Sequence, residues 1–340
     1  MQMLPRERFD KAKEYIMRYG DNVTCTWFRY CFENSDADEL LQALENHQHE
    51  NGGFGGLMYE FEYAGPCLKC TEHAFRILLS MREKISSEHP MIRKMVGYVL
   101  ERYRPEIGRW GELLEPEVNE GLHVPWWTYP TAVLPPMADD DERIRLYNPN
   151  GDAALAALVS YWSDLVPQKL YRQIIKYPVE HILRYYDRHS PLFGRSARLD
   201  HGKNDIECPY NLKCYQQLVD CLPDREMAAK LAAILSQNPQ ACMELNYAAW
   251  ENTYAELPCD VVQSPKSAVY PAVANLVQDS LDYLIRRQSE DGAWQLTWRF
   301  GKDERFREME RRYEANYTLL MLNRLSAFGR LEGVVSTGNA

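Results

Sequence analysis

The sequence predicts an all-α protein. Apolar residues recur three or four positions apart through most of the chain, as in residues 72–85 and 170–189, and this is the period of an amphipathic helix. No convincing run alternates apolar and polar residues as a half-buried strand would. A short glycine-aromatic motif recurs between the expected helices, which indicates a repeated unit of helix, turn and helix.

Composition narrows the class of protein further. The 340 residues include 45% hydrophobic and 26% charged residues, a balance typical of a folded globular chain. We expect one domain over residues 1–335 and a flexible tail over 336–340. The net charge of -10 gives no general attraction to nucleic acid, and no apolar stretch of about 18 residues encodes a transmembrane span.

The expected location is cytoplasmic. The first twenty residues are charged where a secretory signal needs an apolar run, and the nine cysteines show no disulfide-type spacing. Cys67 and Cys70 have C-x-x-C spacing but lack a second pair with zinc-site spacing, so we interpret them as small core residues.

The clearest repeat joins residues 48–54 to residues 288–294. Both segments read Gln, two residues, Asn or Asp, Gly, a small residue and an aromatic residue. Weaker echoes at 104–112 and 189–197 keep only glycine and the aromatic residue. These glycines do not form a known phosphate-binding motif. A dinucleotide-binding loop requires G-x-G-x-x-G and a P-loop ends in Lys-Ser or Lys-Thr, and both patterns are missing here.

A structural role explains the motif. Glycine after Asn51 or Asp291 can adopt a left-handed conformation at low steric cost, so the chain can reverse sharply between antiparallel helices. The amide of the preceding glutamine both donates and accepts hydrogen bonds, and it can therefore hold exposed backbone groups at a helix end. We predict that the aromatic residue packs back over the turn.

This motif resembles the QW-type repeats of squalene-hopene cyclases and related terpenoid cyclases, and more loosely the glycine-rich turns of protein prenyltransferase β subunits. The resemblance extends over roughly residues 37 to 327. It implies an α/α toroid, in which an inner ring of helices is surrounded by an outer ring and encloses a central cavity. Ligands of such toroids bind in that cavity and at its rim.

On this template the helices fall into two sets. The outer helices are expected near residues 37–47, 90–103, 167–186, 224–235 and 268–287. The inner helices are expected near residues 68–82, 150–163, 205–221, 240–255 and 311–327. Two leading helices, near 5–19 and 22–34, would complete a sixth pair and close the ring.

A long insertion over residues 112–150 is a candidate rim element. Its prolines disfavour helix, and it concentrates aromatic surface in a connection longer than a helical hairpin requires. We predict that His123, Trp126, Trp127 and Tyr129 form a lid or substrate-binding wall of the cavity. The alternative is that these aromatic residues plug one end of the molecule as core.

The resemblance also suggests a catalytic acid. Class II terpenoid cyclases protonate an alkene with an aspartic acid of a D-x-D-D motif, and the nearest match here is Asp139 to Glu142, with glutamate in the final place. Asp139 and Asp141 are therefore candidate proton donors; alternatively, they are solvated acids at a helix start. Protein prenyltransferases bind zinc through a D-x-C pair, which is missing here, and we expect neither a metal nor a cofactor.

A second hypothesis comes from toroids that cleave polysaccharides. There, carboxylates, histidine and tyrosine serve as acid, base or charge neutraliser, and aromatic residues stack on sugars. Several such residues lie near the start of expected inner helices, where each is otherwise a helix cap or a first-turn acid. They are Glu72, His73, Asp152, Glu207, Tyr210 and Glu314.

Three functions therefore remain open. The leading one is a cyclase-like enzyme acting on a prenyl or other apolar small molecule. The second is a carbohydrate-active enzyme of the lyase or glycosidase type, and the third is a non-catalytic binding or scaffold protein. An apolar cavity with a deep acid would favour the first, an open acidic groove the second, and a cavity filled by the chain's own side chains the third.

Overall fold

The structure is a computed structural model that describes residues 1–130, 135–185, 207–253 and 255–334. Over these residues the chain forms fourteen α-helices, short 3-10 turns and isolated β-bridges, with no β-strand. The all-α prediction is confirmed. Within the same residues no helix is both long enough and apolar enough to cross a membrane.

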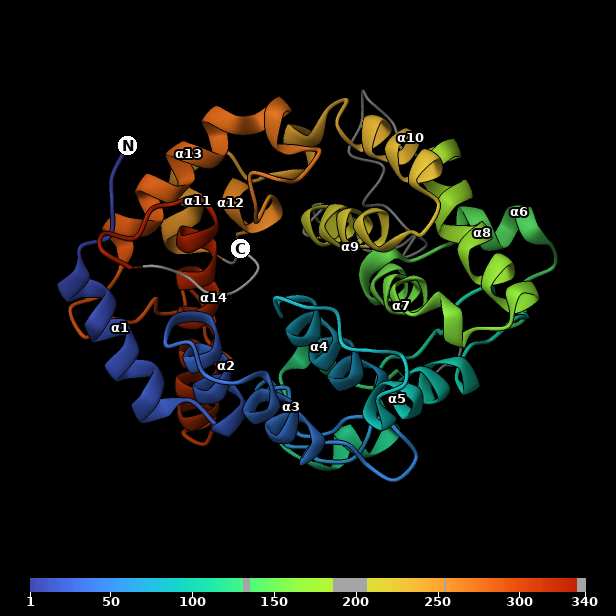
Figure 1. Ribbon diagram of the computed structural model, residues 1–340, viewed down its shortest axis with the longest axis horizontal. Helices are drawn as coiled ribbons and strands as arrows, with labels where there is room; N and C mark the ends of the chain where they lie inside the picture. Colours follow the sequence, from blue (N-terminus) through green and yellow to red (C-terminus); the bar gives the residue numbers. More distant parts are fainter. Residues whose placement is uncertain (131–134, 186–206, 254, 335–340) are drawn as a thin grey trace.

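One set of helices lies along the periphery in Figure 1. The predicted starts and ends of these helices agree with the observed ones to within about two residues. The set comprises α1 (Arg6–Tyr19), α3 (Ala37–Glu45), α5 (Pro90–Glu101), α8 (Gln168–Tyr185), α10 (Arg225–Leu235) and α13 (Tyr270–Arg287). Aspartates at position 36 and 224 begin α3 and α10 by accepting a backbone N–H of the first turn, the usual task of an N-cap.

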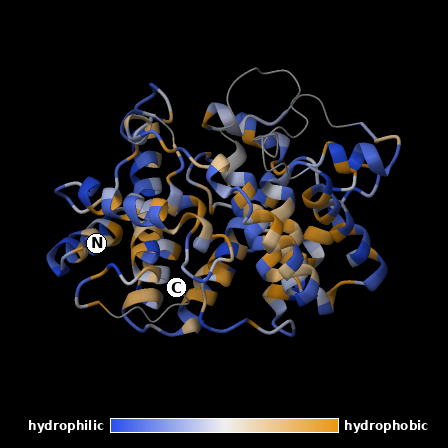
Figure 2. Ribbon diagram, turned by 90° about the horizontal axis from the view of Figure 1, so that it is seen from above, coloured by the Kyte–Doolittle hydropathy of each residue, from blue (hydrophilic) through white to orange (hydrophobic). Residues whose placement is uncertain are grey.

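A second set lies nearer the middle of the same view. It comprises α2 (Asn22–Phe32), α4 (Leu68–Leu79), α7 (Pro149–Tyr161), α9 (Glu207–Cys221) and α14 (Phe306–Ala327). α7 is buried nearly all round and packs most extensively against α9. Figure 2 shows hydrophobic residues concentrated on the packed helices and hydrophilic residues on the outlying turns.

The helix predicted over 240–255 is wrong. The chain there forms a 3-10 turn (Pro239–Cys242), α11 (Tyr247–Asn252) and, further on, α12 (Pro258–Val261). Pro239 and Pro258 each occupy the first turn of their own short helix, where the missing N–H is not needed. Two separate helix starts within twenty residues leave no room for one continuous helix. The short α6 (Asp140–Arg145) lies at the periphery beside α8.

The two matching glycine-aromatic turns have the same hydrogen bonds. The side-chain amide of Gln48 donates to the carbonyl of Gly52 and to that of Met91 on α5, at 3.0 and 2.9 Å. The amide of Gln288 donates to the carbonyl of Gly292 and to that of Arg8 on α1, at 2.8 and 3.0 Å. Both glycines have φ of 91°. The glutamine therefore joins its own turn to the next peripheral helix, as the predicted structural role requires.

The aromatic residues of these turns are anchored to the inner set of helices. The backbone N–H of Phe54 donates to Thr71 Oγ1 on α4, and that of Trp294 donates to Thr318 Oγ1 on α14. The weak echo at 104–112 follows the same plan, since the N–H of Trp110 donates to Asp152 Oδ1 on α7 at 3.0 Å. The echo at 189–197 and the predicted tail over 336–340 lie outside the described residues.

The beginning and end of the chain lie side by side. Leu4 and Leu331 form a parallel bridge, and α1 packs against α14. The turn at Gly292 also presses on α1, because a Cβ at that position would lie 2.3 Å from the backbone of Lys11. One buried hydrophobic cluster extends from Leu4 to Leu331.

Candidate functional site

Helix α4 turns a polar stripe away from its packed face. Lys69, Glu72, His73 and Arg76 occur at positions i, i+3, i+4 and i+7, which share one side of a helix. The other side is apolar and buried, with Cys70, Ala74, Phe75, Ile77 and Leu78 among its residues. A helix of the inner set therefore presents charged groups to the interior of the molecule.

Glu72 is the centre of this stripe. Its side chain is 2% exposed, Lys69 Nζ lies 2.8 Å from its Oε2, and the guanidinium of Arg76 binds its Oε1. Burial alone would raise the pKa of Glu72, but the charges of Arg76 and Lys69 lower it to about 2. Glu72 is therefore a carboxylate held by two cations at neutral pH.

His73 is neutral at pH 7. Burial is the main cause that lowers its pKa, and the neighbouring Arg76 lowers it further, to about 4. Its ring is half-buried and keeps accessible surface. A neutral imidazole is able to accept a proton, which is the property that a general base needs.

Three other elements direct charged groups toward the same interior. Lys213 on α9 pairs with Glu256, which precedes α12, at 2.8 Å. Asp260 on α12 pairs with Arg324 on α14. The charge of Glu256 acts on the pKa of Arg76 on α4 and on that of Tyr317 on α14, so these groups share one neighbourhood.

We call this group the interior polar cluster. Its members are Glu60, Lys69, Glu72, His73, Arg76, Lys213, Glu256, Asp260, Tyr313, Tyr317 and Arg324. Several members keep accessible surface although protein surrounds them: the side chain of Arg76 is 36% exposed, that of Lys213 16% and that of Glu256 13%. The pKa values of several members are shifted by burial and by the charges of other members, and groups of perturbed ionisable side chains often mark a functional site.

Aromatic residues from two connecting segments lie beside the cluster. The indole N–H of Trp126 donates to Glu60 Oε1 at 2.9 Å, and the ring centroid of Trp127 lies 5.2 Å from Lys69 Nζ. Phe300, from the segment before α14, meets Trp126 edge to face at 6.3 Å between ring centroids. Trp126 is 51% exposed, so an aromatic surface faces solvent next to the charged interior.

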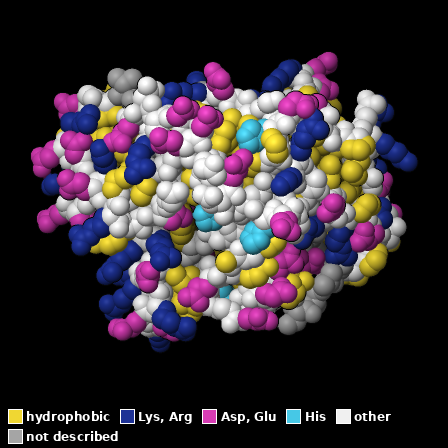
Figure 3. All heavy atoms as spheres, turned by 60° about the horizontal axis from the view of Figure 1, so that its bottom comes forward, with side chains coloured by type: hydrophobic (Ala, Val, Ile, Leu, Met, Phe, Trp, Pro, Cys, Tyr) yellow, Lys and Arg dark blue, Asp and Glu magenta, His cyan; other side chains and the backbone are white. Residues whose placement is uncertain are grey.

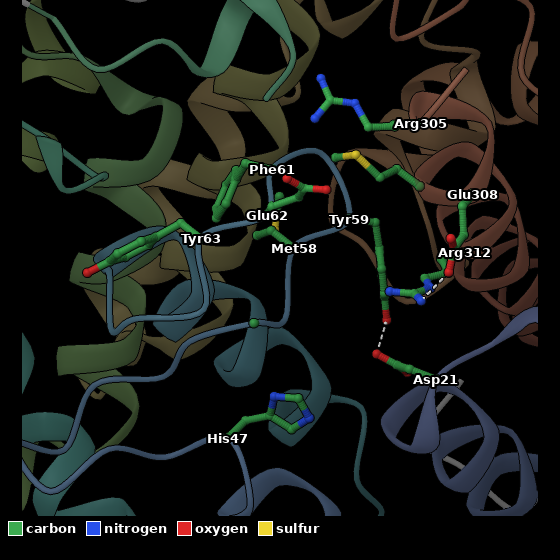
Figure 4. Close-up of a pocket in the computed structure, with 12 residues that line it drawn as sticks. Asp21, His47, Met58, Tyr59, Phe61, Glu62, Tyr63, Arg305, Glu308 and Arg312 are labelled. Carbon is green, nitrogen blue, oxygen red and sulfur yellow. Dashed lines mark hydrogen bonds and ion pairs between the residues drawn. The ribbon is translucent and has the colours of Figure 1, made fainter. Parts of the chain in front are cut away.

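A separate pocket opens near the start of α14 and is shown in Figure 4. We call it the rim pocket; its volume is about 510 Å³. Its walls come from Asp21 at the start of α2, the segment after the first glycine turn, and the first turns of α14. The lining residues are Asp21, His47, Gly56, Met58, Tyr59, Phe61, Glu62, Tyr63, Arg305, Glu308, Met309 and Arg312.

The two predicted proton donors lie elsewhere. Asp139 is the exposed N-cap of α6, where its Oδ1 accepts the N–H of Glu142 at 2.9 Å. The side chain of Asp141 is 81% exposed and pairs with Arg184 at 2.7 Å. A proton donor to an alkene has to be desolvated inside an apolar cavity, so these positions correct the assignment in favour of the solvated helix start.

Two further predicted acids hold turns together. Asp152 is buried on α7 and accepts the N–H of Trp110, with Arg109 3.7 Å away; its role is that of Thr71 and Thr318, not of a catalytic acid. Burial is the main cause that raises the pKa of Asp152, to about 6. Glu314 accepts the hydroxyl of Tyr15 at 3.0 Å, so it faces α1.

Four of the remaining predicted residues belong to the interior polar cluster or lie beside it, and His123 does not. His73 belongs to the interior polar cluster, Trp126 and Trp127 contact it, and the ring centroid of Tyr210 lies 4.6 Å from Lys213 Nζ. His123 is bound within its own segment, with Nδ1 3.0 Å from the carbonyl of Gly121.

The last two predicted residues are Tyr129 and Glu207. Tyr129 is half-buried, and its N–H donates to Asn119 Oδ1 at 2.8 Å. Glu207 begins α9, but its side chain lies outside the described residues.

Most of the interior polar cluster was missed from the sequence. The available signal was the spacing of Lys69, Glu72, His73 and Arg76, which puts charge on one face of a helix whose other face is apolar. Glu60 and Glu256 gave no such signal, because they lie in irregular segments whose direction depends on the whole fold. In the described part of the chain, no three His, Cys, Asp or Glu side chains are grouped as a metal site.

Comparison with known protein families, curated proteins and solved structures finds no match to this chain. The functional conclusion therefore depends on the geometry of these two regions.

Proposed function

We propose that this chain is an α/α toroid that binds a polar, hydroxyl-rich ligand of the sugar class in its interior and acts on it by acid–base chemistry. The peripheral and inner sets of helices would be the two rings, closed where α1 meets α14. The observation that carries the proposal is the interior polar cluster itself, in which α4, α9, α12 and α14 direct charged side chains toward one space.

The charges of the interior polar cluster favour a sugar over a prenyl ligand. A prenyl chain placed against Glu72, Arg76 and Lys213 would remove water from charged groups and return no hydrogen bonds, which is unfavourable. A sugar offers many hydroxyl groups that donate and accept, and its ring faces stack on exposed aromatic side chains such as Trp126. We therefore use the resemblance to terpenoid cyclases only for the proposed fold. For the proposed ligand we use the second hypothesis, a carbohydrate-active enzyme.

The cluster contains groups suited to proton transfer. His73 is neutral and accessible, which suits a general base. Burial raises the pKa of Glu60, so this carboxyl is the candidate proton donor. Glu72 stays ionised beside it through Lys69 and Arg76. Carboxyl groups whose pKa values are moved in opposite directions by their surroundings are the usual basis for dividing acid and base roles.

Ligand binding tests the proposal directly. Neutral, amino and acidic oligosaccharides and a prenyl alcohol are each titrated into the protein while tryptophan fluorescence and thermal stability are followed. We expect one sugar class to bind the native chain and the control Arg93→Gln, whose side chain is 52% exposed on α5, but to bind Arg76→Gln at least about tenfold more weakly. Binding of the prenyl alcohol alone, or equal sugar binding by both variants, would overturn the proposal.

Activity is tested with the sugar that binds. His73→Gln is expected to retain binding and lose turnover, measured as new reducing ends or as unsaturated product absorbing in the ultraviolet. The matched control is His49→Gln, because His49 is exposed and bonded only to the carbonyl of Ala64 among the described residues. Full turnover by His73→Gln would show that His73 is not the general base.

A further inference from the structure

Each carboxylate of the rim pocket has at least one partner within the protein. Asp21 accepts the N–H of Thr24 at 2.7 Å with Oδ1 and the hydroxyl of Tyr59 at 2.9 Å with Oδ2. Glu62 accepts the N–H of Leu122 at 3.1 Å, and Glu308 is held by Arg312. These contacts hold the acids in the wall of the pocket.

Two arginines of the pocket have guanidinium nitrogens that their own ion pairs do not use. Arg305 uses Nε and Nη2 on the single oxygen Oδ2 of Asp303, at 3.1 and 2.7 Å, which leaves Nη1. Arg312 uses Nη2 on Glu308, which leaves Nε and Nη1. The two residues are seven positions apart, so they lie on the same side of α14 about two turns from each other. Their side chains are 66% and 55% exposed and can turn to a ligand.

The rest of the pocket is largely apolar. Phe61 and Met309 are buried side chains of the pocket wall, and Met58 and Tyr63 are half-buried. Figure 4 shows Phe61 and Tyr63 on one side of the space and Arg305 and Arg312 on the other. A volume of about 510 Å³ falls in the range of small-molecule sites, which combine apolar walls with a few polar groups that fix orientation.

The cations of the pocket are a local feature. On the face shown in Figure 3, acidic and basic side chains are interspersed without a broad patch of one sign. A ligand drawn by long-range charge alone would find no preferred region there. Discrimination has to come from guanidinium groups that form paired, directional hydrogen bonds with carboxylate or phosphate oxygens.

We propose that the rim pocket is a binding site for a small organic anion, a carboxylate or phosphate monoester carried on a ring or short apolar body. Arg305 and Arg312 bind the anionic group, and Phe61, Tyr63 and Met309 contact the body. This site shares no residue with the interior polar cluster, although the charge of Asp21 reaches His73, and its test uses probes and variants other than those of the proposed sugar-binding interior.

Calorimetric titration tests the site with phenyl phosphate, phenylacetate, benzyl alcohol and inorganic phosphate as separate probes. We expect binding of phenyl phosphate or phenylacetate, and the stronger of the two identifies phosphate or carboxylate as the anionic group. Removing either arginine as Arg305→Gln or Arg312→Gln should weaken that binding by about tenfold or more. Both side chains are exposed, so these variants are expected to fold.

The controls are Arg307→Gln and Arg76→Gln. Arg307 is exposed on α14 but does not line the pocket, and Arg76 belongs to the interior; both variants should bind the aromatic anion as the native chain does. Equal binding of benzyl alcohol or of inorganic phosphate would overturn the proposal. So would equal loss in Arg307→Gln, or no binding of either aromatic anion.

Discussion

Replacing Glu72 with glutamine tests whether the charges of the interior are coupled as the structure indicates. Glu72→Gln keeps the size of the side chain but leaves Lys69 and Arg76 without their shared carboxylate. Loss of one partner from a buried ion pair costs about 3–5 kcal/mol. A second route gives a similar number: lowering the pKa from 4.5 to about 2 corresponds to about 3 kcal/mol. We expect unfolding free energy to fall by about 3 kcal/mol at pH 7.

The pH dependence of that loss follows from the direction of the pKa shift. Because the folded state lowers the pKa of Glu72, its stabilising effect is present above the unfolded pKa near 4.5 and disappears as the pH falls toward 2. Urea unfolding of the native chain and of Glu72→Gln should therefore differ most at pH 7 and converge in acid.

The matched control is Glu308→Gln, which removes an exposed i, i+4 partner of Arg312 and should cost less than about 0.5 kcal/mol. The reasoning is refuted when Glu72→Gln costs no more than this control, or when its loss is the same at every pH.

Three further predictions concern the turns that hold the helices together. Asp152→Asn should remove part of the pH dependence of stability. Because the pKa of Asp152 is raised to about 6, its favourable contribution is present below about pH 3.9 and is lost as the pH rises through 6. The melting temperature of the variant should therefore change less between about pH 4 and 6 than that of the native chain. Gly292→Ala should destabilise the folded state by about 2 kcal/mol or more, because φ is 91° and the added Cβ meets backbone. In the control Gly97→Ala the added Cβ meets nothing within 4 Å, and this variant should be slightly more stable in thermal unfolding. Thr318→Val should cost about 1–3 kcal/mol in urea unfolding, because the buried N–H of Trp294 loses its acceptor, and an unchanged midpoint would contradict that role.

Local rules explain why the helices could be predicted from the sequence. α10, for example, begins at the residue after Asp224 and carries apolar residues at helical spacing up to Leu235, so its cap and its buried face both lie within one short stretch of sequence. The glycine turns were equally local, since a positive φ and the two hydrogen bonds donated by Nε2 of Gln288 require only the turn and one neighbouring helix. Local structure and final packing agree at these positions.

The candidate site depended on longer-range placement. Asp139 and Asp141 were candidates because they resemble a D-x-D-D motif, and Asp152 because it lies near the start of an expected inner helix; yet the first two start a helix at the periphery and the third accepts a backbone N–H. Capping and catalysis use the same residue types, so the sequence could not separate them. Glu60 was invisible for the opposite reason: it stands in an irregular segment, and only the fold brings it to Trp126 and near Lys69.

Two acids of the interior polar cluster follow directly after the segment 240–255, where the predicted continuous helix is not found. A continuous helix would place about one side chain per turn on its inward face, and these side chains would lie along a straight line. The broken chain instead places Glu256 against Lys213 on α9, while Asp260, four residues later, accepts the N–H of Leu257 and pairs with Arg324 on α14. Two cations on different helices are thereby matched by one short irregular segment. Departures from regular structure tend to occur where function imposes its own geometry, and this break between helices lies next to the charged cluster that we propose as the sugar-binding site.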